Sequence, residues 1–106
     1  MTKNKKIVKK VKIEPSKRED KKLVAIFYTD DGKKVKTTHF GAKGMSDFTK
    51  HGDPERKKKY ITRHKARENF EDFLTAGSLS RYVLWEKKDL EASKKFYANR
   101  FNLELL

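Results

Sequence analysis

The sequence feature that most constrains the fold is a β-hairpin signal in the first half of the chain. Residues 23–29 read LVAIFYT, a short apolar run rich in β-branched and aromatic residues, and DDGK follows at 30–33. An Asp-Gly pair between two such segments is typical of a tight hairpin turn. Residues 34–40 then alternate in type, as a returning strand does. We therefore predict a two-stranded antiparallel hairpin over residues 23–40.

Both faces of the first predicted strand are apolar. Leu23, Ala25 and Phe27 alternate with Val24, Ile26 and Tyr28. A two-stranded hairpin alone is marginally stable in water, so each of these faces should be covered. We expect the helices to cover one face and a partner or the N-terminal segment to cover the other.

Capping residues mark three helix starts in the second half of the chain. Asp53 precedes Pro54, which combines a side-chain N-cap with a proline at the first helical position. Ser78 and Asp89 stand in comparable places before two further segments. The predicted helices cover residues 54–67, 79–85 and 90–101.

Positive charge is concentrated in two parts of the chain. The 106 residues carry a formal net charge of +13, with ten Lys or Arg against three acids in residues 1–22 and twelve against three in residues 33–67. Residues 1–22 hold few apolar side chains, so alone they should not offset their ordering entropy. We predict a basic flexible arm over residues 1–22 and a small α+β domain over residues 23–106. The fold class is then α+β: a basic N-terminal arm, a two-stranded antiparallel β-hairpin and about three short helices.

Composition also limits the class of partner. A field of this sign favours nucleic acid, an acidic protein face or an anionic membrane surface, whereas the plain alternative is a solvated surface. The chain has no cysteine, which excludes disulfides and thiolate metal sites. No apolar run is long enough to span a membrane, and we expect no signal peptide. We expect a protein kept inside a cell or inside a particle assembled there.

The candidate binding residues lie on the basic arm and on the first predicted helix. Tyr60, Arg63, His64 and Arg67 are spaced i, i+3, i+4 and i+7, so they share one helix face. Arginine suits phosphate or carboxylate, and Tyr or His can stack on a base. The structural alternative is that Arg63 and Arg67 pair with Asp47, Glu68 or Glu71. The full candidate set is Lys5, Lys6, Lys9, Lys10, Lys12, Lys43, Arg56, Lys57, Arg63, His64 and Arg67.

Two other patterns give weaker signals of chemistry. The segment 41–44 reads GAKG and has the composition of a phosphate-binding loop, but it lacks the full pattern, and a tight turn is the favoured interpretation. His39, His51 and His64 with Asp47 and Asp53 match no known spacing of metal ligands. No catalytic group, metal, cofactor or small-molecule substrate is therefore expected.

Three segments together carry a family resemblance. The first is FGAKGxSDFTxH over residues 40–51, and the last is TAGxLSRYVLW over residues 75–85. Between them, residues 56–70 supply Arg56, Tyr60, Arg63-His64 and Glu68-Asn69-Phe70. This pattern resembles a family of small uncharacterised basic proteins of large DNA viruses that infect algae and amoebae, over roughly residues 23–103. Phe70 and Tyr82 stand where such relatives often have Trp, and both keep an aromatic ring. The resemblance implies a viral setting and no assigned activity.

From these observations we expect a non-enzymatic structural component of a large DNA virus particle. It would be a minor capsid or inner-virion protein whose basic arm binds an acidic partner, either capsid protein or packaged DNA. The alternative is a free nucleic-acid-binding module that acts on viral or host DNA or RNA, and a nuclease-like enzyme is a remote third hypothesis. The expected location is the virion, with the host cytoplasm or nucleus during assembly.

Overall fold

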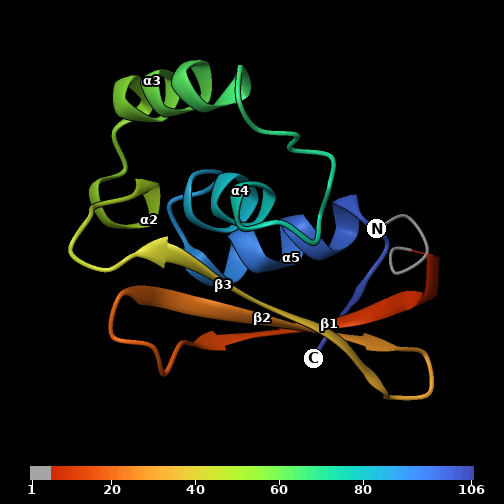
Figure 1. Cartoon of the computed structure of the whole chain (residues 1–106). Helices are drawn as coiled ribbons and strands as arrows, with labels where there is room; N and C mark the ends of the chain where they lie inside the picture. Colours follow the sequence, from red (N-terminus) through yellow and green to blue (C-terminus); the bar gives the residue numbers. More distant parts are fainter. Residues whose placement is uncertain (1–5) are drawn as a thin grey trace.

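In the computed structural model, residues 6–106 are described. The elements in chain order are β1 (Val8–Pro15), β2 (Lys21–Thr29), β3 (Lys34–Ala42), α2 (Phe48–His51), α3 (Pro54–Lys65), α4 (Ala76–Leu79), the π-helix η1 (Ser80–Leu84), α5 (Leu90–Arg100) and β4 (Glu104–Leu105). The helices lie on one face of the sheet, and α3 lies farthest from it, beyond α4 (Figure 1). The other face of the sheet carries no helix in this part of the chain.

The sheet has four strands in the order β3-β2-β1-β4. β1 pairs antiparallel with β2, β2 pairs antiparallel with β3, and β4 runs parallel to β1. The predicted fold class, a basic arm attached to a two-stranded hairpin, is therefore wrong in two respects. The sheet has four strands instead of two, and part of the expected arm forms the strand β1. The class remains α+β, but the sheet is mixed and begins at Val8.

The strand β1 was mistaken for an arm because its lysines dominate its composition. Val11 and Ile13 are buried in the core, whereas Lys10 and Lys12 alternate with them on the helix-free face. Lysine stems can lie along such a face while their ammonium groups stay in water. Pro15 takes the last position of the strand, where a missing N–H costs little. The pairing of β1 with β2 also crosses the expected boundary between residues 22 and 23.

The predicted β2–β3 hairpin is confirmed. Its turn is closed by hydrogen bonds from the Thr29 N–H to the Lys33 carbonyl and from the Gly32 N–H to the Thr29 carbonyl. Gly32 has φ +88°, a conformation that the turn requires and glycine adopts without strain. Between the sheet and the helices lies the core, whose most buried large side chains are Tyr97, Phe27, Phe40, Leu79, Val11 and Val83.

Two of the three predicted caps are confirmed. Asp53 and Asp89 accept backbone hydrogen bonds at the starts of α3 and α5. Ser78 is not a cap: its hydroxyl is buried and donates to the Phe70 carbonyl, and Thr75 caps α4 instead. The helix that begins there continues as η1, where the Trp85 N–H reaches back five residues to the Ser80 carbonyl.

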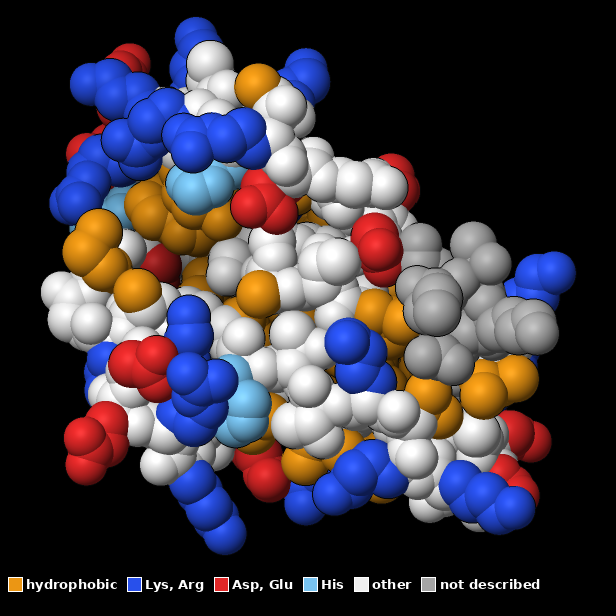
Figure 2. Space-filling model, viewed as in Figure 1, with side chains coloured by type: hydrophobic (Ala, Val, Ile, Leu, Met, Phe, Trp, Pro, Cys, Tyr) orange, Lys and Arg blue, Asp and Glu red, His pale blue; other side chains and the backbone are white. Residues whose placement is uncertain are grey.

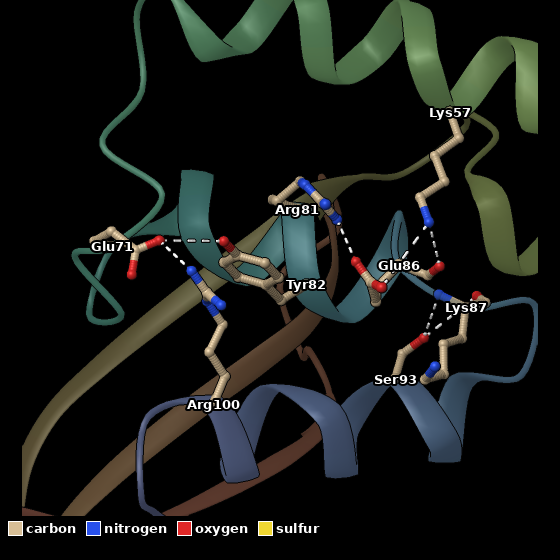
Figure 3. A network of polar contacts seen from close by, with 8 residues as sticks. All are labelled: Lys57, Glu71, Arg81, Tyr82, Glu86, Lys87, Ser93 and Arg100. Carbon is tan, nitrogen blue, oxygen red and sulfur yellow. Dashed lines mark hydrogen bonds and ion pairs between the residues drawn. The ribbon is translucent and has the colours of Figure 1, made fainter.

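A polar network ties η1 to its neighbours (Figure 3). The Glu86 carboxylate is 2.6 Å from Arg81 and 4.0 Å from the Lys57 ammonium. Glu71 accepts from Arg100 at 2.5 Å and from the Tyr82 hydroxyl at 3.3 Å. These contacts link α3, the loop before α4 and α5 through one short helical segment. Within residues 6–106, no helix has the length and apolar character needed to cross a bilayer.

Candidate nucleic-acid interface

The helix α3 is attached to the rest of the fold by one side only. Tyr60 stacks on Trp85 with ring centroids 4.3 Å apart and planes 4° apart, and His64 stacks on the other face of Tyr60 at 4.2 Å. The Lys57 ammonium donates to the Glu86 carbonyl at 2.7 Å and lies over the Phe48 ring. These contacts leave the remaining sides of α3 to solvent.

Four cations form a line along one flank of α3. Arg56, Lys59 and Arg63 are spaced i, i+3 and i+7 on α3, and Arg67 follows in the turn after the helix ends at Lys65. All four are exposed, and we call them the α3 stripe. At a rise of about 1.5 Å per residue the helical part of the stripe, from Arg56 to Arg63, is about 10 Å long. Lys58 and Lys65, seven residues apart, lie on the other flank and are exposed as well. Basic side chains accordingly gather over α3 in the space-filling view (Figure 2).

The α3 stripe has no acidic partner among residues 6–106. The sequence also allowed Arg63 and Arg67 to pair with nearby acids, but those acids pair with other residues or form no ion pair. Asp47 pairs with Lys22 at 2.5 Å, and Glu71 pairs with Arg100. Glu68 forms no ion pair within the described part of the chain. Residues 54–67 hold seven Lys or Arg and one acid, so the flank is strongly positive.

The other candidate residues do not join this line. Lys57 points inward to Glu86, and His64 stacks on Tyr60, whereas Lys43 lies exposed in the turn after β3. Lys6, Lys9, Lys10 and Lys12 belong to the segment that leads into and forms β1, and Lys5 lies outside the described residues. Because α3 and the sheet lie on opposite sides of α4, the β1 lysines and the α3 stripe form separate basic regions (Figure 1).

A hollow of about 340 Å³ opens beneath α3. Its lining comes from the ends of β2 and β3, the second half of α3 and the α4–η1 segment: Lys21, Lys22, Phe40, Gly41, Ala42, Met45, Ser46, Asp47, Tyr60, Arg63, His64, Glu68, Ala76, Gly77, Ser80, Leu84 and Trp85. In Figure 2 it appears below the basic side chains of α3, with hydrophobic side chains in its wall. All three segments of the family resemblance therefore contribute to one cavity.

Buried groups hold the hollow in shape. Asp47 is 2% exposed, binds Lys22, and also accepts from the Thr49 N–H as the N-cap of α2. Burial, and then the negative charge of Glu68, raises the pKa of Tyr60 to about 12, although a hydrogen bond with Ser80 opposes the shift. Tyr60 thus stays a neutral phenol at physiological pH. Gly41 has φ +78° and lets Leu84 approach, since a Cβ here would lie 2.7 Å from the Leu84 Cδ1.

The contact between Glu68 and Gly77 was not predicted from the sequence. The Glu68 carboxylate lies against Gly77, where an added Cβ would be 1.7 Å from Oε2. The two residues are nine positions apart and meet only because the loop between them folds back. Gly41 still belongs to β3, and the tight turn follows it, with φ +89° at Gly44 and a hydrogen bond from the Met45 N–H to the Ala42 carbonyl.

The three histidines have different partners. His39 is hydrogen-bonded to the Ser16 hydroxyl at 2.7 Å, and His51 Nδ1 accepts from the Asp53 N–H at 2.9 Å. His64 belongs to the ring stack. Among residues 6–106, no group of three His, Cys, Asp or Glu side chains is arranged to hold a metal ion.

Comparison with known proteins gives one family match. The model of a family of unknown function, DUF5754, matches residues 11–64, which run from β1 through α3 and make up about half of the chain. No curated protein and no solved structure matches. The chain therefore belongs to the DUF5754 family, whose function is unknown.

Proposed function

We propose that this protein is a non-enzymatic, DNA-binding structural component of a large DNA virus particle. The α3 stripe, rather than an N-terminal arm, carries the contacts to phosphate. The observation that supports this most is the line of four exposed cations without an acidic partner among residues 6–106. The viral setting itself rests on the sequence resemblance alone.

The contrast with the other arginines of the chain supports a binding role for the stripe. Arg18, Arg81 and Arg100 each form an ion pair with a nearby carboxylate, at 3.1, 2.6 and 2.5 Å. The stripe concentrates unneutralised charge instead, which carries a cost in self-repulsion that a polyanion would relieve. The helical part of the stripe, about 10 Å long, is similar to the rise over three phosphate steps of one strand, at about 3.4 Å each.

The salt dependence of DNA binding tests this proposal. With four phosphate contacts, the slope of log K against log salt should be about −3.6, at about −0.9 per contact on duplex DNA. Affinity should then fall by about 150-fold between 50 and 200 mM salt. Fluorescence anisotropy with a labelled duplex and the full chain measures this slope. A salt-independent affinity, or no binding at 50 mM salt, would contradict the proposal.

The proposed location needs its own measurement. Quantitative mass spectrometry of purified particles should recover the protein at a copy number comparable to that of other structural components. Its absence from particles, combined with strong DNA binding, would favour a free nucleic-acid-binding module. Presence in particles without DNA binding would instead favour an acidic capsid protein as the partner.

A further inference from the structure

We propose that the hollow beneath α3 binds the base of a guanine nucleotide, with the Glu68 carboxylate accepting hydrogen bonds from the N–H groups of the base. This goes beyond the proposed function, since a free nucleotide tests it without any DNA. The hollow, at about 340 Å³, has the size of a small-ligand site.

Glu68 is the acid of the hollow that has no partner within residues 6–106. Asp47, the other acid in the lining, is already paired with Lys22 and caps α2. The Glu68 carboxylate is held against Gly77, is half-buried, and has no ion-pair or hydrogen-bond partner within residues 6–106. An ionised carboxylate only accepts hydrogen bonds, so a ligand at this place must bring donors.

The charges around Glu68 narrow the class of ligand. Lys21 and Arg63 line the same hollow, so its cations favour a ligand that also carries negative charge. A bare phosphate would be repelled by Glu68, and a lysine or arginine side chain would be repelled by the cations. A nucleotide satisfies both conditions, because its base supplies N–H donors and its phosphate supplies the negative charge.

Guanine matches the carboxylate best among the bases. Its Watson–Crick edge presents two neighbouring N–H groups, which both oxygens of one carboxylate can accept. Enzymes that extrude a base read this same edge by hydrogen bonds and hold the ring against aromatic or apolar side chains. Here the stacked rings of His64, Tyr60 and Trp85, with Phe40, supply the aromatic wall.

Calorimetric titration of the full chain with the four 5′-ribonucleoside monophosphates tests the inference. GMP should bind at least about tenfold more tightly than AMP, CMP or UMP, as expected for a paired hydrogen-bond contact to a base. Glu68→Gln should weaken GMP binding by about tenfold or more, because the amide presents an N–H to a donor. Gly77→Ala should do the same, since the new Cβ displaces the carboxylate.

The matched control is Glu55→Gln, which removes the same charge from an exposed position near the start of α3, outside the hollow. It should leave GMP binding unchanged. Equal affinity for all four nucleotides, or no GMP binding at millimolar concentration, would overturn the inference. The base selectivity of the unaltered chain decides the question even if a variant fails to fold.

A second binding experiment identifies whether the guanine comes from a strand or from a free nucleotide. A ten-residue oligothymidylate with one central guanine is compared with the same strand without guanine. Tighter binding of the guanine strand assigns the hollow to a base within a strand, and binding of GMP alone assigns it to a free nucleotide. A chain that binds duplex DNA with the expected salt slope but not GMP would retain the proposed function and overturn this inference.

Discussion

Replacing Asp47 with asparagine should lower the free energy of unfolding by about 3–5 kcal/mol, the usual cost of removing one partner of a buried ion pair. Asp47 is 2% exposed and the Lys22 side chain is 12% exposed, with 2.5 Å between the ammonium and the carboxylate. No second acid pairs with Lys22 within the described residues. The substitution therefore leaves an ammonium group largely removed from water without a counter-charge.

The helix cap is not the source of this expected loss. Asp47 also caps α2 by accepting from the Thr49 N–H, but asparagine is an equally good N-cap. Asp53→Asn makes the same chemical change at the exposed cap of α3 and should cost less than about 1 kcal/mol. Comparing the two variants thus separates the effect of losing the buried charge from the effect of losing a carboxylate at a helix cap.

Urea unfolding followed by the fluorescence of Trp85, the single tryptophan, measures both variants. Adding Lys22→Met to Asp47→Asn should recover most of the loss, because the double variant buries no unpaired charge. The reasoning is refuted if Asp47→Asn costs under about 1 kcal/mol, or if the double variant is less stable than Asp47→Asn alone.

Two further changes test the walls of the hollow. The folded pKa of Tyr60, about 12, lies above its ordinary value of 10.0, so the stability that the neutral phenol confers is complete below pH 10 and is lost as pH rises toward 12. At about 1.4 kcal/mol per pKa unit, the free energy of unfolding should fall by roughly 3 kcal/mol across this range. Urea unfolding at several pH values measures the fall, and Tyr60→Phe should remove this contribution. Gly41→Ala should lower the thermal unfolding temperature by more than Gly44→Ala. Both glycines have positive φ, but only a Cβ at Gly41 would meet a neighbour, the Leu84 Cδ1 at 2.7 Å. Equal losses would contradict the close packing of Leu84 against Gly41.

Local signals predicted the parts of the fold that depend on neighbours in sequence. The Asp31-Gly32 turn and the caps at Asp53 and Asp89 were correct because each acts within four residues. The Ser78 cap was wrong because Thr75 takes that role and Ser78 turns inward to Phe70. A local rule identifies residues able to cap a helix but does not decide which of two nearby candidates is used.

Elements that depend on distant contacts were not predicted. The lysines of β1 concealed a strand whose pairing with β4 joins Lys10 to Glu104, across nearly the whole length of the chain. No pattern within β1 itself indicates so distant a partner. The helix α2 is one turn long and was missed as well, although Asp47 and Thr49 form its cap.

The candidate site was predicted in part. Arg56, Arg63 and Arg67 were proposed from sequence and lie on the α3 stripe, whereas Lys59 completes it and was overlooked despite its readable spacing. Lys57 was proposed as well but points to Glu86. The approach of Glu68 to Gly77 depends on the loop before α4 and has no signal in either residue alone.

The salt slope of DNA binding in two charge-matched variants tests the central claim most directly. Lys59→Gln with Arg63→Gln removes two charges from the α3 stripe, and Lys58→Gln with Lys65→Gln removes two from the other flank of the same helix. The stripe variant should reduce the slope by about 1.8 and weaken binding by about 60-fold at 0.1 M salt, whereas the flank variant should leave the slope unchanged. Equal effects of the two variants would show that only net charge matters and would contradict a defined phosphate-binding line on α3.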